Sequence, residues 1–407
     1  MRILCLHVEG FRSLRDVTWA PGKLNVVIGP NGTGKSNLLR LLELTARAAR
    51  GGLSRYVQAS GGMQALLWDA RAEEILVKLK MSPSDEGSDK ERNSLTYELR
   101  LGRIGGSSGY RVTHELLGNY WASEREDQAE RLKLLERDPA SGRIYPHGGE
   151  ALNIRVERFH EEETILSLVA FPPFRDERGF PEGMALRYQD HVASWSVHHD
   201  FRVDPEASIR SPILTRFERR VDPDGENLVN VLHTLYTEDR EFKGEVNLAM
   251  RAAFGEDFEE LVFSPAADQR VQLRVQWRSL KHPQSTADLS DGILRFLFLL
   301  AVLASPHAAP VIAIDEPETG LHPGMMPIVA EYAVEAARSR QVVLTTHSPA
   351  FLDAFGETVP RTTVALWEEG QTILRVLDGD VLDRWRQEYS LGKLLTSGEL
   401  EQLAGAE

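Results

Sequence analysis

Hydrophobic and polar residues alternate in short runs over the N-terminal third of the chain, and this period of two is typical of strands with one buried face. The clearest runs lie at residues 2–9, 74–80, 95–101 and 110–116, and a fully apolar run lies at residues 24–28. Loop-forming stretches at residues 82–93 and 105–109 separate the later runs. Neighbouring strands joined by such loops predict an antiparallel sheet.

The hydrophobic period becomes helical from about residue 165 to residue 263, most clearly at residues 227–236 and 244–254. A strand pattern at residues 271–277 and an apolar helix pattern at residues 293–303 follow. The chain then returns to strand patterns at residues 311–314, 342–346, 363–367 and 372–377. These changes predict three consecutive parts: a lobe at residues 1–164, a helical subdomain at residues 165–265 and a second lobe at residues 266–407.

One charged stretch and the lack of heptads refine this organisation. Residues 123–138 mix Glu with Arg and Lys at helical spacing, which predicts an exposed insertion. No heptad array of useful length is present, which argues against the long coiled-coil arms of a chromosome-organising protein.

A glycine-rich loop lies between the apolar run at residues 24–28 and a helical pattern that continues to residue 50. It consists of Gly29, Pro30, Asn31, Gly32, Thr33, Gly34, Lys35, Ser36 and Asn37. Glycines let the backbone N–H groups turn inward, and the start of the following helix adds unpaired donors and partial positive charge. Lys35 supplies a point charge to the outer phosphates, and Ser36 is placed to ligate Mg²⁺. The pattern predicts a nucleotide-binding P-loop, which by itself leaves kinases, GTPases, helicases and ABC-type ATPases open.

Three later motifs narrow this choice. Asp315 and Glu316 end the strand pattern at residues 311–314, as in a Walker B motif, where Asp315 holds Mg²⁺ and Glu316 acts as general base. His347 ends the next strand pattern and can reach a γ-phosphate. The run Leu289, Ser290, Asp291 and Gly292 opens the helix at residues 293–303 as a second anion-binding N-terminus. Each also has a structural alternative: acids at a loop start, a capping or core histidine, and an ordinary helix cap.

In this order, the motifs resemble those of ABC ATPases. The resemblance implies an α/β P-loop NTPase fold of ABC ATPase type, with a central, mostly parallel sheet, a flanking antiparallel β-subdomain and an inserted helical subdomain. It also implies a head-to-tail homodimer that holds two Mg–ATP, in which the Leu289–Gly292 signature of one subunit covers the γ-phosphate held by the other. Lys35, Glu316 and His347 would be the catalytic residues.

Details of the motifs are similar to RecF/SMC-like ATPases, and more narrowly to stand-alone bacterial "predicted ATPase" proteins of the AAA family related to the overcoming-lysogenization-defect (OLD) group. They include the N-terminal residues 6–14, the acidic motif at residues 315–323, and residues 222–228 and 385–394. The resemblance implies a nucleotide contact for Arg12, whose alternative is a solvated strand end. Glu318 and His322 would belong to a D-loop at the dimer interface, or would only shape a turn.

One feature departs from this family. Relatives carry a glutamine, called the Q-loop residue, near the entry to the helical subdomain, whereas Leu168 stands there in this chain. Either the coupling is altered or the correspondence is displaced, and Gln189 is a distant substitute. His198 and His199 have no second ligand pair at metal-binding spacing and are interpreted as loop residues.

Composition agrees with a cytoplasmic ATPase. The chain of 407 residues exceeds one compact core and contains a single cysteine, Cys5, which excludes an internal disulfide. No N-terminal signal-peptide pattern is present, and the apolar stretch at residues 296–314 is interrupted by Pro306 and Pro310, so no membrane association is expected.

The formal net charge of −14 does not favour nonspecific DNA binding. The four arginines that are close in sequence are interpreted as a solvated face: Arg210, Arg216, Arg219 and Arg220.

The sequence thus predicts an ATPase that closes as a dimer on Mg–ATP and opens after hydrolysis, and that passes this switch to a separate effector or to DNA. The OLD-like resemblance implies bacterial anti-phage defence or DNA repair. Because too little chain follows residue 377 for a Toprim nuclease domain, a nuclease or Toprim-like effector is expected to be a separate protein. The alternatives are the ATP-binding subunit of a membrane transporter, which the doubtful Q-loop and the Leu-Ser-Asp-Gly signature disfavour, and an ATP-gated scaffold without turnover, which Glu316 disfavours.

Overall fold

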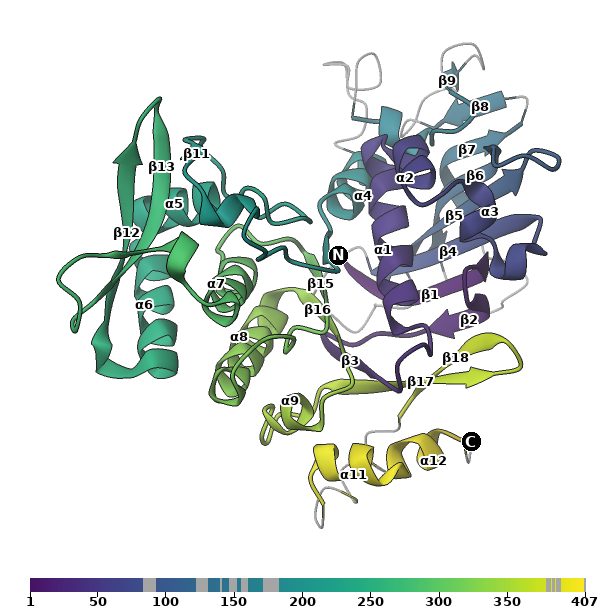
Figure 1. Cartoon of the computed structure of the whole chain (residues 1–407). Helices are drawn as coiled ribbons and strands as arrows, with labels where there is room; N and C mark the ends of the chain where they lie inside the picture. Colours follow the sequence, from purple (N-terminus) through teal and green to yellow (C-terminus); the bar gives the residue numbers. More distant parts are fainter. Residues whose placement is uncertain are drawn as a thin grey trace. The chain divides into compact units, whose positions relative to one another are not determined.

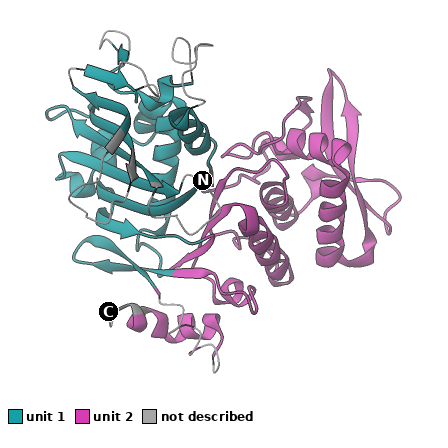
Figure 2. Cartoon of the chain, turned by 180° about the vertical axis from the view of Figure 1, so that it is seen from behind, with its two compact units in different colours: residues 1–22, 29–195, 363–376 teal, residues 23–28, 196–362, 377–407 magenta. Residues whose placement is uncertain are grey.

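A computed structural model describes residues 1–82, 93–121, 131–139, 141–145, 152–154, 160–170, 183–377, 382, 385 and 389–405. The chain forms two compact units that interleave in sequence (Figure 2). Unit 1 contains residues 1–22, 29–195 and 363–376, and unit 2 contains residues 23–28, 196–362 and 377–407. This grouping differs from the three consecutive parts expected from the sequence, because the sheet of unit 2 gathers strands from distant parts of the chain.

Unit 1 is built on an eight-stranded sheet with the order β2-β1-β4-β5-β6-β7-β8-β9, in which every neighbouring pair is antiparallel. Its strands are β1 (Arg2–Phe11), β2 (Leu14–Trp19), β4 (Glu74–Ser82), β5 (Asn93–Arg103), β6 (Tyr110–Trp121), β7 (Arg131–Asp138), β8 (Ser141–Ile144) and β9 (Leu152–Ile154). The antiparallel β-subdomain expected from the alternating runs is therefore present.

Helices cover one face of this sheet, as Figure 1 shows for α1, α2 and α4. The helices of unit 1 are α1 (Lys35–Arg50), α2 (Leu53–Ala59), α3 (Met63–Leu66), α4 (Met184–Ala193), and the 3₁₀ helices η1 (Trp68–Ala70) and η4 (Leu166–Leu168). Residues of β17 (Arg361–Glu368) from Thr363 onward and β18 (Gln371–Val376) complete the unit as an antiparallel hairpin whose second strand contacts β2.

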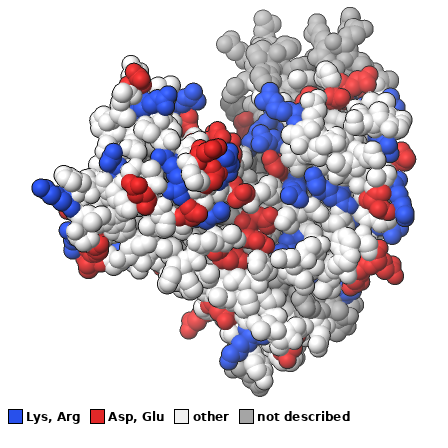
Figure 3. All heavy atoms as spheres, in the orientation of Figure 1, with Lys and Arg blue, Asp and Glu red and all other residues white. Residues whose placement is uncertain are grey.

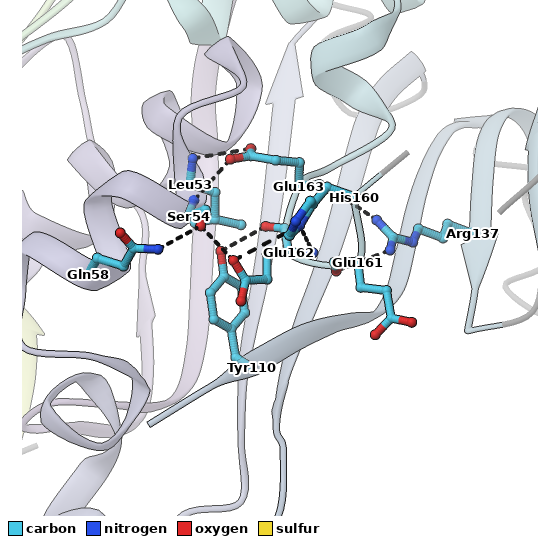
Figure 4. Close-up of polar contacts among 9 residues, drawn as sticks. All are labelled: Leu53, Ser54, Gln58, Tyr110, Arg137, His160, Glu161, Glu162 and Glu163. Atoms are coloured by element: carbon cyan, nitrogen blue, oxygen red, sulfur yellow. Dashed lines mark hydrogen bonds and ion pairs between the residues drawn. The ribbon is translucent and has the colours of Figure 1, made fainter. Parts of the chain in front are cut away.

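Polar contacts fasten the segment at residues 160–163 to both the helices and the sheet of unit 1 (Figure 4). The Glu163 carboxylate accepts hydrogen bonds from the backbone N–H groups of Leu53 (3.2 Å) and Ser54 (3.0 Å) at the start of α2. Tyr110 of β6 donates to the Glu162 carbonyl at 2.7 Å, and Arg137 of β7 donates to the Glu163 carbonyl. The segment thus joins the two layers of the unit.

Unit 2 contains parallel strands in the order β10-β15-β16-β3. They are β3 (Leu24–Ile28), β10 (Ser196–His198), β15 (Val311–Asp315) and β16 (Gln341–Thr346). Pairing of Asp315 with Thr345 and of Thr346 with Ile28 brings the carboxyl ends of β15, β16 and β3 to one edge. Loops that leave such an edge commonly form ligand sites in parallel sheets. The chain leaves this edge after Ile28 and enters the P-loop of unit 1 at Gly29.

Helices and a smaller sheet complete unit 2. The small sheet contains β11 (Ile213–Leu214), β12 (Phe258–Ala266), β13 (Arg270–Trp277) and β14 (Gln284–Ser285). The α-helices are α5 (Leu228–Glu238), α6 (Arg240–Phe254), α7 (Asp291–Leu303), α8 (Met326–Ser339), α9 (Pro349–Asp353), α11 (Leu391–Ser397) and α12 (Glu399–Gly405). The 3₁₀ helices are η5 (Ser208–Arg210), η6 (Gly255–Asp257), η7 (Thr286–Asp288) and η8 (Pro323–Met325).

Two sequence expectations are corrected by pairing partners that the local pattern does not reveal. Residues 258–263, at the end of the stretch expected to be helical, belong instead to β12, because β13 supplies its ladder of hydrogen bonds. The described part of the charged insertion forms β7 between β6 and β8, with Leu135 and Arg137 buried. Tertiary pairing overrides local propensity at both places. Residues 122–130 of that insertion lie outside the described residues.

Candidate functional site

The P-loop connects Ile28 to α1 and places Lys35 inside its own curve. The Lys35 side chain is buried, and its ammonium donates hydrogen bonds to the carbonyls of Gly29 (2.8 Å) and Pro30 (3.0 Å). Thr33 closes the same turn, since its hydroxyl donates to the Pro30 carbonyl at 2.9 Å. Asn31 and Gly32 are exposed at the tip, while Ser36 and Asn37 lie in the first turn of α1. The loop therefore presents a cation and a helix N-terminus together, as anion binding requires.

Gly34 is a P-loop position that requires glycine. Its φ is +94°, and a Cβ there would lie 2.0 Å from Thr372 Oγ1 and 2.5 Å from Ser13 Oγ. These two hydroxyls bond to each other at 2.6 Å, and Thr372 also donates to the Thr33 carbonyl at 2.8 Å. Asn37 donates to Ser13 at 2.7 Å. Sequence analysis missed Ser13 and Thr372 as supports of the loop, and no local motif at Thr372 could have revealed this role.

Arg12 lies in the turn between β1 and β2, beside the residue that supports the P-loop. Its φ is +49°, and its backbone N–H donates to the Leu66 carbonyl at 2.7 Å. Burial and the nearby positive charge of Arg40 lower the pKa of the Arg12 guanidinium. This half-buried position is unlike that of a solvated strand end, and the nucleotide contact of Arg12 stays a prediction.

The acidic motif after β15 contains a strained glutamate. Thr345 of the neighbouring β16 donates its hydroxyl hydrogen to the Asp315 carboxylate. The Glu316 backbone N–H donates to the carbonyl (3.2 Å) and the hydroxyl (3.1 Å) of the same threonine. Glu316 has a φ of +46°, a conformation that costs about 1 kcal/mol for a residue with a Cβ. Such strain is typical of functional residues whose surroundings hold them in place.

Glu316 and His347 contact each other across the ends of two adjacent strands. His347 Nδ1 lies 2.9 Å from Glu316 Oε1, and the two side chains are 45% and 34% exposed. The pair is thus accessible from the carboxyl edge of the sheet while the Asp315 side chain, 13% exposed, is more enclosed. A carboxylate that a histidine orients in this way can accept a proton from a water molecule.

Glu318 and His322 shape the segment that follows. Thr346 donates a hydrogen bond to the buried Glu318 carboxylate, and burial raises the pKa of Glu318. His322 Nδ1 accepts the Gly324 N–H at 3.1 Å and caps η8. Both residues therefore have a turn-shaping role within the unit, and a role at a dimer interface remains a prediction.

His199, which sequence analysis assigned to an ordinary loop, lies beside the candidate site. It follows β10, whose last residue, His198, pairs with Ile314 of β15. His199 Nδ1 consequently lies 3.7 Å from Asp315 Oδ2, with the ring 24% exposed. The signal in the sequence was only a short valine-containing strand before two histidines. It becomes informative once β10 is known to pair with the Walker B strand.

The two residues considered for the Q-loop both belong to unit 1. Leu168 belongs to η4 of unit 1, and Gln189 of α4 is buried and donates to the Ala49 carbonyl at the end of α1, at 2.9 Å. Gln189 thus has a structural contact with a helix end. His199 lies beside Asp315 within unit 2, and no residue of this chain is assigned to the Q-loop.

The signature residues form the start of α7. Ser290 is its N-cap and accepts the Ile293 N–H at 3.4 Å, while Leu289 is buried. Gly292 lies against the segment after Glu318, since a Cβ on Gly292 would be 2.9 Å from the Gly320 carbonyl. Only a residue without a side chain allows this approach. The signature helix and the predicted D-loop are therefore packed together within unit 2.

Arg210 holds the signature segment and corrects its interpretation as a solvated residue. Its guanidinium donates to the carbonyls of Thr286 (3.1 Å) and Leu289 (2.9 Å) and to the Asp291 carboxylate, and its side chain is 10% exposed. The positive charge also offsets the negative charge that Asp291 places at a predicted phosphate-binding helix start. The other arginines of the group, Arg216, Arg219 and Arg220, are exposed as expected.

The donor groups fit Mg²⁺ and a nucleoside triphosphate. A serine hydroxyl and a carboxylate are hard oxygen ligands of the kind that Mg²⁺ prefers, and Ser36 and Asp315 provide them. The buried Lys35 ammonium and the N–H groups at the start of α1 are the cation and donors that outer phosphates would need. The described residues contain no helix long and apolar enough to cross a membrane.

Comparison with known proteins places these features in a family. Residues 24–353 match the family model AAA_21, described as "AAA domain, putative AbiEii toxin, Type IV TA system". Two solved structures share the fold. An Smc head bound to the C-winged helix domain of ScpA has a TM-score of 0.56 and 16% identity, covering 94% of this chain and 100% of that one.

The second structure is an Smc head with an extended coiled coil, bound to the C-terminal domain of ScpA derived from Pyrococcus furiosus. It has a TM-score of 0.52 and 15% identity, and the match covers 95% of this chain and 98% of that one. No curated protein matches the chain. The similarity to Smc heads concerns the fold, which is an SMC-head-like P-loop ATPase fold of the ABC type, as the sequence predicted.

Proposed function

This chain belongs to the AAA_21 family, and from that premise we propose that it is an ATPase that closes as a head-to-tail dimer on Mg–ATP and opens after hydrolysis. The observation that carries the proposal is the strained Glu316, bonded through its side chain to His347 and through its backbone to Thr345. A scaffold that only binds nucleotide has no need for a positioned base. This arrangement therefore favours turnover over the scaffold alternative.

When bound, ATP supplies the phosphoryl group and Mg²⁺ neutralises charge on its oxygens. Lys35 and the N–H groups at the start of α1 would hold and orient the outer phosphates, while Ser36 and Asp315 would serve as ligands of the cation. Glu316 accepts a proton from the attacking water, and His347 keeps the carboxylate in place. His199 adds a contact that fixes the orientation of Asp315.

The dimer is proposed because one chain offers two phosphate-binding helix starts, α1 and α7, that belong to different units. We propose that α7 of one subunit faces the nucleotide held by the P-loop of the other. In this dimer, Arg210 would neutralise the charge of Asp291 at the start of α7, the helix that faces the phosphates of the other subunit's nucleotide.

The output of this cycle is proposed to reach a separate effector, a nuclease or Toprim-like protein, or DNA, in bacterial anti-phage defence or DNA repair. The family description names a toxin of a type IV toxin–antitoxin system, and the Smc heads are described with a bound ScpA domain. These descriptions concern other proteins, but both support a partner-coupled ATPase. Neither names a transporter, so the transporter alternative is not carried forward.

The charge of the chain makes DNA a less favoured partner than a protein effector. The chain has a formal net charge of −14, and on the face in Figure 3 the described Lys and Arg side chains lie among Asp and Glu in both units. Nonspecific DNA binding depends on many basic side chains meeting phosphates. A protein effector is therefore proposed first.

The test uses Glu316→Gln, which removes the base but keeps the side-chain shape. Light scattering should show a monomer without nucleotide and a dimer with Mg–ATP. Adding Ser290→Arg, which blocks the opposing phosphate, should restore the monomer while leaving ATP binding intact. A monomeric Glu316→Gln protein at saturating Mg–ATP would refute the head-to-tail dimer. Affinity purification of the closed variant from its native cells would then identify the effector.

A further inference from the structure

A groove in unit 2 lies between α6 and α8 and is distinct from the nucleotide motifs. It has a volume of about 590 Å³ and is also bordered by the end of α7. The two helices pack together and can be followed in Figure 1. None of the predicted nucleotide-binding or catalytic residues lines it.

The floor of the groove is apolar. Phe242, Leu248, Ala249 and Ala252 of α6 contribute to its lining at helical spacing, and Ile328 does so from α8. Leu248 is 62% exposed, although the same helix buries Phe242, Val246, Ala249 and Met250. An apolar stripe of this kind can receive the apolar face of another helix.

The rim of the groove is acidic. Five carboxylates line it: Asp239, Glu241, Glu245, Glu331 and Glu335. Arg340 is the one Lys or Arg among the described lining residues, and its guanidinium donates to the Ser305 carbonyl at 3.0 Å. Tyr332 of α8 donates to the backbone carbonyl (3.0 Å) and the carboxylate (2.8 Å) of Glu245, which fixes the two helices relative to each other. The walls are thus preformed and negatively charged.

We propose that this groove docks a basic amphipathic helix of a partner protein. The apolar floor fits the apolar face of such a helix, and Lys or Arg side chains beside that face would meet the carboxylates on both walls. The lining of α6 extends from Asp239 to Ala252, a length of roughly 20 Å at the rise of an α-helix. This length suits a helix of several turns. The same charge repels nucleic acid and anionic lipid, so those ligands are not favoured.

The groove has a direct connection to the catalytic residues along the chain. α8 is the helix between β15, which ends at Asp315, and β16, which precedes His347. A partner on α8 would therefore contact the element that joins the two catalytic strands. The docking itself does not require ATP hydrolysis, so it goes beyond the proposed function and can fail or succeed independently of it.

The test uses a fluorescent peptide of roughly 18 residues, five helical turns, with Leu on one face and Lys on the other. A matched peptide carries Glu in place of every Lys, and a third replaces every Leu by Ser. Fluorescence anisotropy should show that the Leu/Lys peptide binds at least about tenfold more tightly than either control peptide. A photoreactive group on its apolar face should cross-link to α6 or α8.

Two variants of the protein locate the binding. Glu331→Lys with Glu335→Lys should weaken the Leu/Lys peptide by about tenfold or more, and Leu248→Ser should weaken it by several fold. The control, Glu259→Lys with Glu357→Lys, makes the same charge change at exposed acids outside the groove. Equal binding to both charge-reversed proteins, or cross-links outside α6 and α8, would overturn the proposal. So would equal binding of the Leu/Glu peptide, or occupation of the groove by a second copy of this chain. Circular dichroism would establish that each variant is folded.

Discussion

The P-loop and the carboxyl edge of the unit 2 sheet hold their functional groups in different ways. In the P-loop, the groups come from consecutive residues 29–37, and the backbone itself forms much of the site. At the sheet edge, which we call the catalytic edge, Asp315, Glu316, His347 and His199 follow the ends of three strands that are distant in sequence. The first site depends on local backbone geometry, while the second depends on strand pairing.

This difference predicts how each site fails. A change in the P-loop should act through steric fit at one position and remove nucleotide binding. A change at the catalytic edge should leave binding nearly intact and reduce the rate, because neighbouring strands hold each group separately. Four experiments test this contrast, and the largest expected effect comes first.

Gly34→Ala tests whether steric fit in the P-loop controls nucleotide binding. The added Cβ would meet Thr372 Oγ1 at 2.0 Å and Ser13 Oγ at 2.5 Å, on a backbone with φ of +94°. We expect ATP affinity, measured by calorimetry, to fall by about 100-fold or more. Gly32→Ala is the control, since Gly32 also has a positive φ but its Cβ would meet nothing within 4 Å. Equal losses in both variants would show that steric fit at Gly34 is not the cause.

His199→Ala tests the catalytic edge. Loss of the ring beside Asp315 should lower the rate of hydrolysis by about 10- to 100-fold, as for other groups that position reacting atoms. ATP affinity should change by less than about threefold, since the P-loop is untouched. The Mg²⁺ concentration for half-maximal activity should rise, because Asp315 loses a neighbour that orients it. His282→Ala removes an exposed histidine as control. An unchanged metal dependence would contradict a role at Asp315.

The third experiment tests the ion pair between Arg210 and Asp291 at the signature helix. Arg210→Met removes a guanidinium that bonds to several backbone carbonyls and to Asp291, and should weaken ATP-dependent dimerisation by about tenfold. Asp291→Asn in the same protein should recover part of the loss, because it removes the uncompensated carboxylate. The dimerisation constant is measured by analytical ultracentrifugation with ATP, in proteins that also carry Glu316→Gln. Additive losses in the double variant would show that Arg210 does not act by neutralising Asp291.

Glu115→Gln tests the support of unit 1, at a residue that is not among the predicted reacting groups. The buried Glu115 accepts hydrogen bonds from the N–H groups of Ile165 (2.7 Å) and Leu166 (2.9 Å) and from Tyr97 (3.0 Å). Every partner is a donor, so an amide there would leave one donor facing another. We expect a loss of about 1 to 3 kcal/mol in the free energy of unfolding.

The pH dependence of that loss has a definite sign. Burial raises the pKa of Glu115, although hydrogen bonds from Leu166 and Ile165 and the charge of Arg137 oppose this. A carboxyl with a raised folded pKa contributes stability below its unfolded pKa of about 4.3 and loses it as pH rises through the folded value. Wild-type stability should therefore fall more steeply than that of Glu115→Gln over this window. Thermal unfolding at several pH values measures the difference, with the exposed Glu73→Gln as control. Parallel curves would contradict it.

Much of the fold could be read from local patterns. The runs that predicted β4, β5, β6, β15 and β16 and the helical periods of α5, α6 and α7 are all present. Strand β12 and the described part of the charged insertion were assigned wrongly, because their state depends on partner strands rather than on their own residues. The sequence motifs also located the P-loop, Walker B, signature and switch residues, whose roles in this chain remain predictions.

The sequence by itself determined the features that depend on contiguous residues: the P-loop, the buried strands and helix starts, and the acids and histidine that follow them. Only the tertiary structure decided which distant groups support these features. Ser13 reaches Gly34 from the turn between β1 and β2, Thr372 reaches it from β18, and Arg210 reaches the signature from η5. The pairing of β10 with β15 is what brings His199 next to Asp315. The physical reason is that backbone conformation and helix capping follow from neighbours in sequence, whereas hydrogen bonds and charge pairs depend on neighbours in space.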